Sequence, residues 1–534
     1  MLGKSVLKLA LVGALLAATA VQAEGQTVHT LSLDAAQTGA VINRDIFGQF
    51  AEMLGEGIYG GVWVGRDSKI PNVRGIRSDV VQALRAIKVP VVRWPGGCYA
   101  DRYHWRDGIG PAANRRARLN AMWGGVLEPN TFGTDEFMDF VGQIGSEAYL
   151  SVNMGTGTVG EAADWLEYMT ADKPTALAKE RAANGHKAPY HIKYLGLGNE
   201  SWGCGGPMTA DTYVAHMKLF GSFAQNFNPA QSGNPLAPNP DAMKRIAVGP
   251  GDKSTASYAE TVMKEWSTHA FFDRPFEGLS MHNYTMSSMM PMSDAATGFG
   301  EKDYAIFVKK TYGLNDAIAD NIAVMDKYDP EKKVALVVDE WGNWLKPISD
   351  AHLLKQQNSL RDAITASISL DIFARHADRV RMANIAQMVN VIQSMILTDG
   401  PKMVLTPTYY IFKMYMPFQD AQFIPLKLDQ GEYRFGDLKM AQVDGIAAKA
   451  KDGKVWLALT NIDPNQSIDI DASAQGVQAG RAVGEVLTAS TVDAVNSFDA
   501  PPAVTPKPYN VEAMNNRLVL HLPPKSVIVV RLDP

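Results

Sequence analysis

The chain has 534 residues, of which 46% are hydrophobic and 20% are charged, and its formal net charge is -5. This balance is ordinary for a globular protein and gives no basic surface for nucleic acid or anionic membranes. Two cysteines, Cys98 and Cys204, are too few for a disulfide-rich scaffold or a tetrahedral zinc site. No histidine pair has the spacing of a metal site, so we expect neither a metal nor another cofactor.

The first 23 residues have the composition of a secretory signal peptide. Lys4 and Lys8 precede an apolar stretch that ends in the small-residue sequence Val21-Gln22-Ala23. The stretch from Leu9 to Val21 is shorter than the ~20 residues of a membrane-spanning helix. We therefore expect cleavage after Ala23 and export to the periplasm or the medium, without insertion into a membrane.

The rest of the chain divides into three parts. Residues 24–44 contain the alternating segment TVHTLSLDA, which predicts a strand that joins a C-terminal β-sandwich. Over residues 45–415, short apolar runs alternate with stretches of helical period, and eight such βα units close a (β/α)₈ TIM barrel. Residues 416–534 change to short alternating strands with turn residues between them, which predicts an all-β sandwich domain.

Polar residues recur near the C-terminal ends of the eight predicted barrel strands, after apolar positions. In a parallel barrel these ends meet on one face, where barrel enzymes carry out their chemistry. Eight polar residues in the same register therefore predict a functional site on that face. They are Glu52, Arg93, Asn153, Glu200, Asp252, His282, Glu340 and Gln387.

Two of these residues are carboxylates that follow very apolar runs, Glu200 in GLGNES and Glu340 in ALVVDEWGNW. Retaining glycoside hydrolysis needs one carboxylic acid to protonate the leaving oxygen and a second carboxylate, ~5 Å away, to attack the anomeric carbon. Asn199 beside Glu200 suits a hydrogen bond to the sugar hydroxyl next to the reacting carbon. The pattern predicts a retaining glycosidase.

Several longer motifs carry a family resemblance. The segments IFGQFAEMLG, VVRWPGGCYADRYHWRDGIGP, YLGLGNESWGCGG, SMHNYT, VDEWGNW and ANIAQMVNVIQSMI together resemble the α-L-arabinofuranosidases of glycoside hydrolase family 51. The resemblance extends from about residue 40 to the C-terminus. It implies a (β/α)₈ barrel with a C-terminal β-sandwich, retention of configuration, a substrate such as arabinoxylan, arabinan or their oligosaccharides, and frequently a homo-oligomer.

The resemblance also implies roles for individual residues. Glu200 would be the acid/base and Glu340 the nucleophile of an exo-acting enzyme. Cys98 stands at a sugar-facing position where many members of the family have asparagine. The residues that would surround the furanose are Glu52, Arg93, Asn199, His282, Tyr284 and Gln387, with Trp344 near the aglycone side.

The two cysteines follow the second and fourth predicted strands. One strand separates these two, which places them about 10 Å apart at ~4.8 Å per strand. The few residues beyond each strand end could reduce this to the ~5.5 Å Cα separation of a disulfide. We therefore expect a disulfide between Cys98 and Cys204, with two unrelated buried thiols as the alternative.

Two other functions remain open from the sequence. Related barrels with the same glutamate pair cleave β-glycans, so an endo-β-glucanase or xylanase is the nearest alternative. A non-catalytic glycan-binding protein is the second, although a pure binder has no use for both Glu200 and Glu340.

Overall fold

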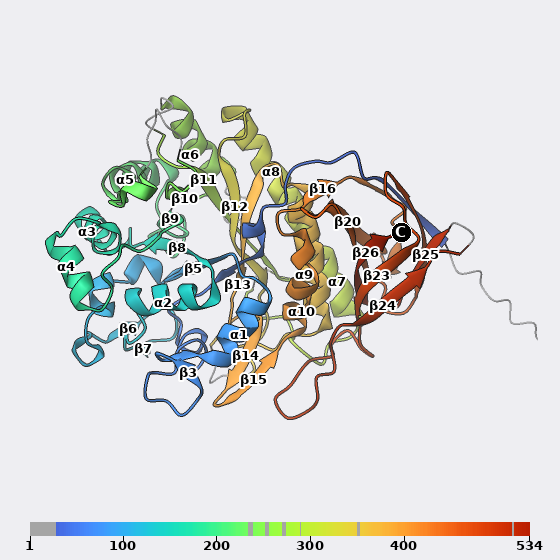
Figure 1. Ribbon diagram of the computed structural model, residues 1–534, viewed down its shortest axis with the longest axis horizontal. Helices are drawn as coiled ribbons and strands as arrows, with labels where there is room; N and C mark the ends of the chain where they lie inside the picture. Colours follow the sequence, from blue (N-terminus) through green and yellow to red (C-terminus); the bar gives the residue numbers. More distant parts are fainter. Residues whose placement is uncertain are drawn as a thin grey trace, which may run out of the picture.

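The computed structural model describes residues 28–232, 239–250, 256–269, 274–288, 290–349, 353–514 and 517–534. Its chain forms a barrel and, beside it, a domain of two β-sheets (Figure 1). The predicted TIM barrel with a C-terminal sandwich is confirmed. The proposed signal peptide and Asp252 lie outside the described residues.

In the described part of the chain, eight strands close the barrel in the order β10-β11-β12-β13-β2-β5-β8-β9, and each strand is parallel to both neighbours. Their residues are almost all buried, as expected for strands covered by side chains inside and helices outside. The barrel strands are β2 (Gly48–Phe50), β5 (Val91–Trp94), β8 (Glu147–Val152), β9 (Tyr194–Leu197), β10 (Lys244–Ala247), β11 (Gly278–Thr285), β12 (Ala335–Asn343) and β13 (Val380–Ala386).

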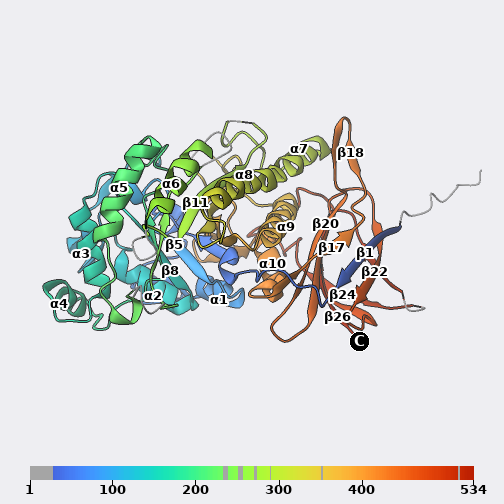
Figure 2. The same ribbon diagram turned by 90° about the horizontal axis from the view of Figure 1, so that it is seen from above.

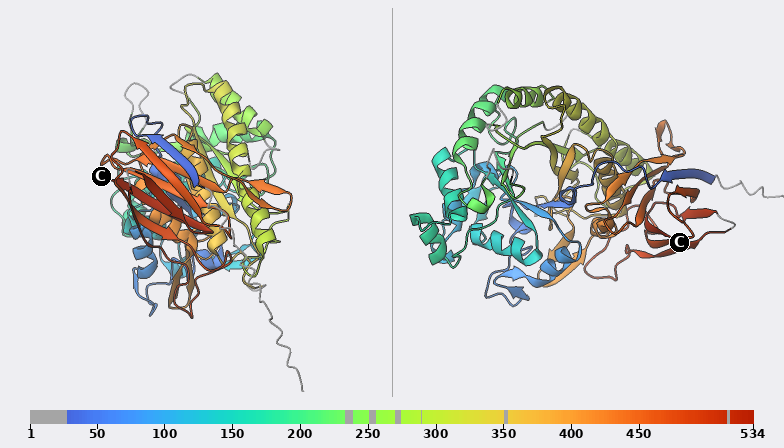
Figure 3. Two further views of the ribbon diagram at one scale, coloured as in Figure 1. Left: turned by 90° about the vertical axis from the view of Figure 1, so that its right-hand side faces the viewer. Right: turned by 45° about the horizontal axis from the view of Figure 1, so that its top comes forward.

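Helices surround the barrel (Figure 3, right), and their ends follow from local sequence signals. Thr158, Thr175 and Thr209 cap three of them by accepting backbone N–H groups. The described helices are α1 (Ser78–Ala86), α2 (Thr134–Ile144), α3 (Val159–Thr170), α4 (Ala176–Ala183), α5 (Ala210–Phe223), α6 (Ala256–Thr268), α7 (Glu301–Thr311), α8 (Gly313–Tyr328), α9 (Leu360–Arg375) and α10 (Pro407–Met414). Within the described ranges, none of them is long and apolar enough to cross a lipid bilayer.

The second domain packs two sheets face to face. One sheet has the order β16-β20-β21-β26-β23-β24 and the other β17-β1-β22-β25. The N-terminal strand β1 therefore pairs with strands from the far end of the sequence (Figure 2). The strands are β16 (Gln422–Ile424), β20 (Val443–Lys449), β21 (Val455–Asn461), β26 (Ser526–Asp533), β23 (Arg481–Leu487), β24 (Lys507–Glu512), β17 (Leu426–Leu428), β1 (Val28–Asp34), β22 (Ile468–Gln475) and β25 (Leu518–Leu522).

Helix α9 joins the two domains. It contacts β13 of the barrel on one side and β20, β21 and β26 of the sandwich on the other, and all its residues except Arg375 are buried. Four two-stranded hairpins also lie in the described part of the chain, besides several short 3-10 helices. They are β3 (Asn72–Val73) with β4 (Ile76–Arg77), β6 (Arg118–Asn120) with β7 (Val126–Glu128), β14 (Ile396–Asp399) with β15 (Lys402–Leu405), and β18 (Tyr433–Phe435) with β19 (Leu438–Met440).

A glycine inside the sandwich offers a test of its packing. Gly484 of β23 pairs with Val530 of β26, and a Cβ at Gly484 would lie 2.0 Å from the carbonyl oxygen of Val529. Since that oxygen belongs to the backbone of a buried strand, Gly484→Ala should lower the free energy of unfolding by about 2 kcal/mol or more. Urea unfolding followed by circular dichroism measures the change.

Gly142→Ala is the matched control. Gly142 lies inside α2, and a Cβ there meets no atom within 4 Å. Alanine should raise helix stability by about 0.5–1 kcal/mol at this position. A Gly484→Ala protein as stable as the parent would contradict the packing described for β23 and β26.

Candidate active site

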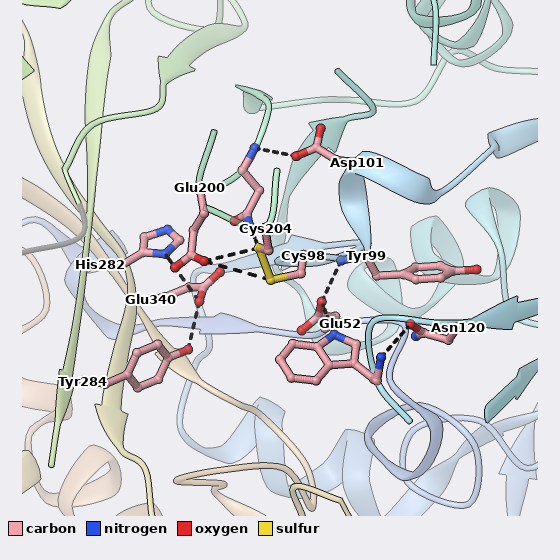
Figure 4. Close-up of a disulfide and its surroundings, with 12 residues drawn as sticks. Glu52, Cys98, Tyr99, Asp101, Asn120, Glu200, Cys204, His282, Tyr284 and Glu340 are labelled. Atoms are coloured by element: carbon pink, nitrogen blue, oxygen red, sulfur yellow. Dashed lines mark hydrogen bonds and ion pairs between the residues drawn. A yellow bond between two sulfur atoms is a disulfide. The ribbon is translucent and has the colours of Figure 1, made fainter. Parts of the chain in front are cut away.

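The predicted site residues come together at the C-terminal end of the barrel, from six of its strands and the loops after them. Figure 4 shows Glu52, Cys98, Glu200, His282, Tyr284 and Glu340 there. Arg93, His282, Tyr284 and Glu340 lie within their strands. The others follow strand ends: Glu52 after β2, Cys98 after β5, Asn199 and Glu200 after β9, Trp344 after β12 and Gln387 after β13.

The chain turns sharply where Glu200 leaves β9. Gly198 has a φ of 88° and Glu200 a φ of 38°, a conformation that is costly for a residue other than glycine. The backbone N–H of Asn199 donates to Asp101 at 3.1 Å. The Glu200 carbonyl accepts N–H groups from Gly203 at 2.7 Å and from Gly205 at 3.1 Å. These bonds hold the strained turn and aim the Glu200 side chain into the site.

The two glutamates face each other across a histidine. One carboxylate oxygen of Glu200, one of Glu340 and a ring nitrogen of His282 all lie within 4.8 Å of one another. His282 Nδ1 is 2.8 Å from Glu200 Oε1 and 3.5 Å from Glu340 Oε2. This spacing matches the ~5 Å carboxyl separation of retaining glycosidases.

Arg93 holds the Glu340 carboxylate in place. Its NH1 donates to Glu340 Oε1 at 2.7 Å and its NH2 donates to Asn199 Oδ1 at 2.6 Å. The guanidinium is 1% exposed, so it contacts the other site residues and has little surface left for a ligand. Tyr284 donates to the second oxygen of Glu340 at 2.9 Å. Glu340 is therefore held at both oxygens.

His282 is held between two acids. Its Nε2 lies 3.1 Å from Asp339 Oδ1, on the side opposite Glu200. Burial alone would lower the pKa of His282, but the charges of Glu340 and Asp339 and the hydrogen bonds to Asp339 and Glu200 raise it to about 10. The imidazole is thus protonated at neutral pH, and its Nδ1 donates to Glu200.

Glu52 lines the side of the site next to Tyr99 and Trp123. It accepts the backbone N–H of Tyr99 and the indole N–H of Trp123, each at 2.9 Å, and it lies 3.4 Å from the Gln387 amide nitrogen. Burial raises the pKa of Glu52 most, and the charge of Glu340 adds to this, so the pKa reaches about 7 despite these bonds. A Cβ at Gly97 would lie 2.9 Å from the carboxyl atoms of Glu52, which explains the glycines of the PGG segment.

Cys98 and Cys204 form a disulfide with a Cα separation of 5.5 Å. It connects the loops after β5 and β9. The Sγ of Cys204 lies 3.3 Å from Glu200 Oε2, and that of Cys98 lies 4.0 Å from the same oxygen. The disulfide is therefore a wall of the site next to Glu200 (Figure 4).

Aromatic side chains lie next to Glu340 and Glu52. Trp344 packs on Tyr284 with ring centroids 5.0 Å apart. Trp344, Tyr284 and Trp123 pack against one small apolar cluster that includes Leu54 and Leu354.

The sequence did not indicate Trp123 or Asp101. Trp123 lies in the β6–β7 hairpin, which Asn120 anchors by donating to the Met53 carbonyl at 2.9 Å. Trp123 is 71 residues from Glu52 in an irregular stretch, and no periodicity marks it. Asp101 accepts the N–H groups of Met154 and Asn199, and burial raises its pKa to about 7. The polar residues around Asp101 do not indicate its role until the hydrogen-bond partners of Asp101 are known.

Comparisons with known proteins identify the family of this chain. Residues 83–287 match the model of the α-L-arabinofuranosidase 1 domain, and residues 339–526 match that of the α-L-arabinofuranosidase C-terminal domain. A Bacteroides ovatus protein named an intracellular exo-α-L-arabinofuranosidase is 42% identical, over 97% of this chain and 98% of its own.

Two solved structures have the same fold over nearly the whole chain. The crystal structure of the family 51 arabinofuranosidase from Xanthomonas axonopodis pv. citri has a TM-score of 0.89 and 46% identity, covering 95% of this chain and all of its own. An arabinose complex of the α-L-arabinofuranosidase from Thermotoga maritima has a TM-score of 0.81 and 30% identity, with the same coverage of 95% and 100%.

One prediction is wrong on this evidence. Export from the cytosol is contradicted by the Bacteroides ovatus relative, which is similar over almost its entire length and is named intracellular. The prediction rested on Lys4 and Lys8, the apolar stretch that follows them and the small-residue end Val21-Gln22-Ala23. An apolar N-terminal stretch fits several fates, and its composition alone does not determine the destination of the chain.

The opposed influences on Glu52 give a testable pH dependence. Trp123→Phe removes an N–H that stabilises the charged carboxylate, so the pKa of Glu52 should rise above 7. Glu340→Gln removes a charge that repels it, so the pKa should fall. Infrared difference titration of the carboxyl band, with Glu52→Gln as the reference protein, measures both. Shifts of the same sign in the two variants would contradict the assignment.

Proposed function

We propose that this chain, which belongs to the α-L-arabinofuranosidases of glycoside hydrolase family 51, uses Glu200 and Glu340 to release L-arabinose by double displacement. It is a glycoside hydrolase, an exo-acting α-L-arabinofuranosidase that removes non-reducing terminal residues. The observation that carries the mechanism is the pair of carboxylates within 4.8 Å, of which Glu340 is held by Arg93 and Tyr284.

In the first step, an oxygen of the Glu340 carboxylate attacks the anomeric carbon. Glu200, as the carboxylic acid, transfers its proton to the leaving oxygen as the glycosidic bond breaks. In the second step, the Glu200 carboxylate takes a proton from water, whose oxygen displaces Glu340 from the anomeric carbon. Two inversions give net retention. Arg93 stabilises the anionic form of Glu340 that both steps require, before attack and on release.

The remaining residues suit recognition of a sugar. Glu52, Gln387 and Asn199 present oxygen and amide groups for hydroxyls from three strand ends, and the disulfide closes the side near Glu200. His282 donates to Glu200 and keeps its carboxyl oriented. Tyr284 would line the furanose, and Trp344, packed on it, offers a face for the part of the substrate beyond the furanose. Arabinoxylan, arabinan and their oligosaccharides are the proposed substrates.

Glu200 and Glu340 should lose different activities when they are replaced. Glu340→Ala removes the nucleophile, so hydrolysis should fall on the order of 10⁴-fold or more on every substrate. Glu200→Ala should lower the rate on arabino-oligosaccharides by about 10²–10⁴-fold, but far less on 4-nitrophenyl α-L-arabinofuranoside, whose leaving group needs no proton. Steady-state rates on both substrates measure this.

Glu277→Gln is the control for these variants. Glu277 precedes β11, at the opposite end of the strand from His282 and Tyr284, and pairs with Arg245. Both activities should stay within about twofold of the parent, since the residue is remote from the chemistry. Equal losses on the two substrates for Glu200→Ala would refute its role as the acid.

The endo-acting alternative is tested by the products. An exo-acting enzyme should release only arabinose from branched arabinoxylan and leave a linear β-glucan or xylan chain intact. A fall in the chain length of either linear polymer would favour the glucanase or xylanase. Binding of the polymers without any hydrolysis would favour a non-catalytic glycan-binding protein.

We further propose that the chain forms a homo-oligomer and binds neither nucleic acid nor membranes. Leu119 and Leu127 are cross-strand neighbours on the β6–β7 hairpin and are 70% and 64% exposed, which suits a contact between copies. Light scattering on the full chain should give a multiple of 58.1 kDa. A monomer mass at micromolar concentration would contradict this.

A further inference from the structure

The disulfide lies against the oxygen of Glu200 that His282 does not use. His282 contacts Glu200 Oε1, whereas both sulfur atoms approach Glu200 Oε2. Cys98, Cys204 and Glu200 thereby place two sulfurs and one carboxylate oxygen within 4.8 Å of one another. In the disulfide the sulfurs carry no charge and bind metals poorly. Two thiolates and a carboxylate, in contrast, are the donors of a zinc site.

We propose that reduction of the Cys98–Cys204 disulfide creates a site for a thiophilic divalent cation such as Zn²⁺, with Glu200 as the third ligand. A small dithiol supplies two electrons and two protons to the disulfide and becomes a disulfide itself. The cation then displaces both thiol protons into solvent and binds the two thiolates. A water molecule completes four-coordination.

The distances already present suit this cation. Tetrahedral zinc with Zn–S of ~2.3 Å and Zn–O of ~2.1 Å requires sulfur-to-oxygen separations of about 3.6 Å. The observed separations from Glu200 Oε2 are 3.3 Å and 4.0 Å, on either side of that value. Only the sulfurs must move apart, from bonding distance to about 3.8 Å. Rotation of the two side chains allows this at a Cα separation of 5.5 Å.

A second cluster, formed by Glu200, His282 and Glu340, is a poorer cation site. Both ring nitrogens of His282 already face carboxylates, Nε2 toward Asp339 and Nδ1 toward Glu200. The Arg93 guanidinium lies 2.7 Å from Glu340 and repels a further cation. We therefore expect the metal to bind at the two sulfurs, and only in the reduced protein.

Metal binding has a direct consequence for the proposed chemistry. A cation on Oε2 prevents Glu200 from carrying the proton that the leaving oxygen needs, so hydrolysis of arabino-oligosaccharides should stop. This consequence goes beyond the proposed function and depends on it. Metal binding itself does not depend on the proposed function, because it can be measured on protein without any substrate.

The test compares the oxidised full chain with protein reduced by dithiothreitol and desalted without oxygen. Co²⁺ is the spectroscopic probe, because thiolate coordination gives it a near-ultraviolet charge-transfer band. The reduced protein should bind one Co²⁺ or Zn²⁺ per chain and show the band, whereas the oxidised protein should show neither. Zn²⁺ should inhibit the reduced enzyme at least tenfold on arabino-oligosaccharides and the oxidised enzyme less than twofold.

Variants separate the ligands. Cys98→Ser/Cys204→Ser should lose the band, and Glu200→Gln should keep it while the metal affinity falls about tenfold. Reduced parent protein alkylated with iodoacetamide serves the same purpose if the double variant fails to fold. Equal binding by oxidised and reduced protein, or no band after reduction, would overturn the proposal. Metal binding by the reduced protein without any loss of hydrolysis would count only against the proposed role of Glu200.

Discussion

The arrangement of the site depends on one buried cation. Arg93 rises from β5 and contacts Glu340 on β12 and Asn199 after β9, so a single side chain connects three strand ends across the barrel. A guanidinium that is 1% exposed is costly to bury unless its charge is paired. Removing Arg93 would leave the buried carboxylates of Glu340 and Asp339 without their shared guanidinium, at a cost of about 3–5 kcal/mol. Glu340 and the amide of Asn199 beside Glu200 are thus placed by the same buried guanidinium.

A second cation balances the remaining acids. Asp339, Glu340 and Glu200 all lie within 3.5 Å of His282, and Asp339 also lies 3.4 Å from Arg93. Burial alone would raise the pKa of Asp339, but Arg93 and His282 lower it below its usual range. Asp339 therefore supplies a permanent negative charge under the histidine, which keeps the imidazole protonated and leaves its Nδ1–H directed at Glu200. The two adjacent acids therefore differ in their contacts: Asp339 holds the histidine, and Glu340 lies near Glu200.

The parts of the structure that were predictable follow from short-range regularities. The alternation of apolar runs and helical stretches gave the barrel, and the register of Glu52, Arg93, Glu200, His282 and Glu340 at strand ends placed them on one face. The spacing of β5 and β9, with one strand between them, also brought Cys98 within reach of Cys204. Each of these steps needs only the geometry of parallel strands.

The parts that were not predictable depend on loops that fold back over long distances. Trp123 reaches Glu52 from a hairpin, and Asp101 reaches both Met154 and Asn199, although nothing in the local sequence connects them. The sequence also left the burial of Arg93 open, since a strand-end arginine has the same pattern whether it faces a ligand or a neighbouring strand.

The conformation of Glu200 shows what these loops contribute. At a φ of 38°, the residue needs stabilisation from outside its own strand. Asp101 supplies it through Asn199, and Gly205 supplies it through the Glu200 carbonyl. A Cβ on Gly205 would lie 1.8 Å from the carbonyl oxygen of Asn199, so the turn closes too tightly for any other residue. The Gly-Asn-Glu sequence at the end of β9 thus adopts a strained backbone, which directs the Glu200 carboxyl across the barrel mouth toward Glu340. Hydrogen bonds from distant residues offset this strain.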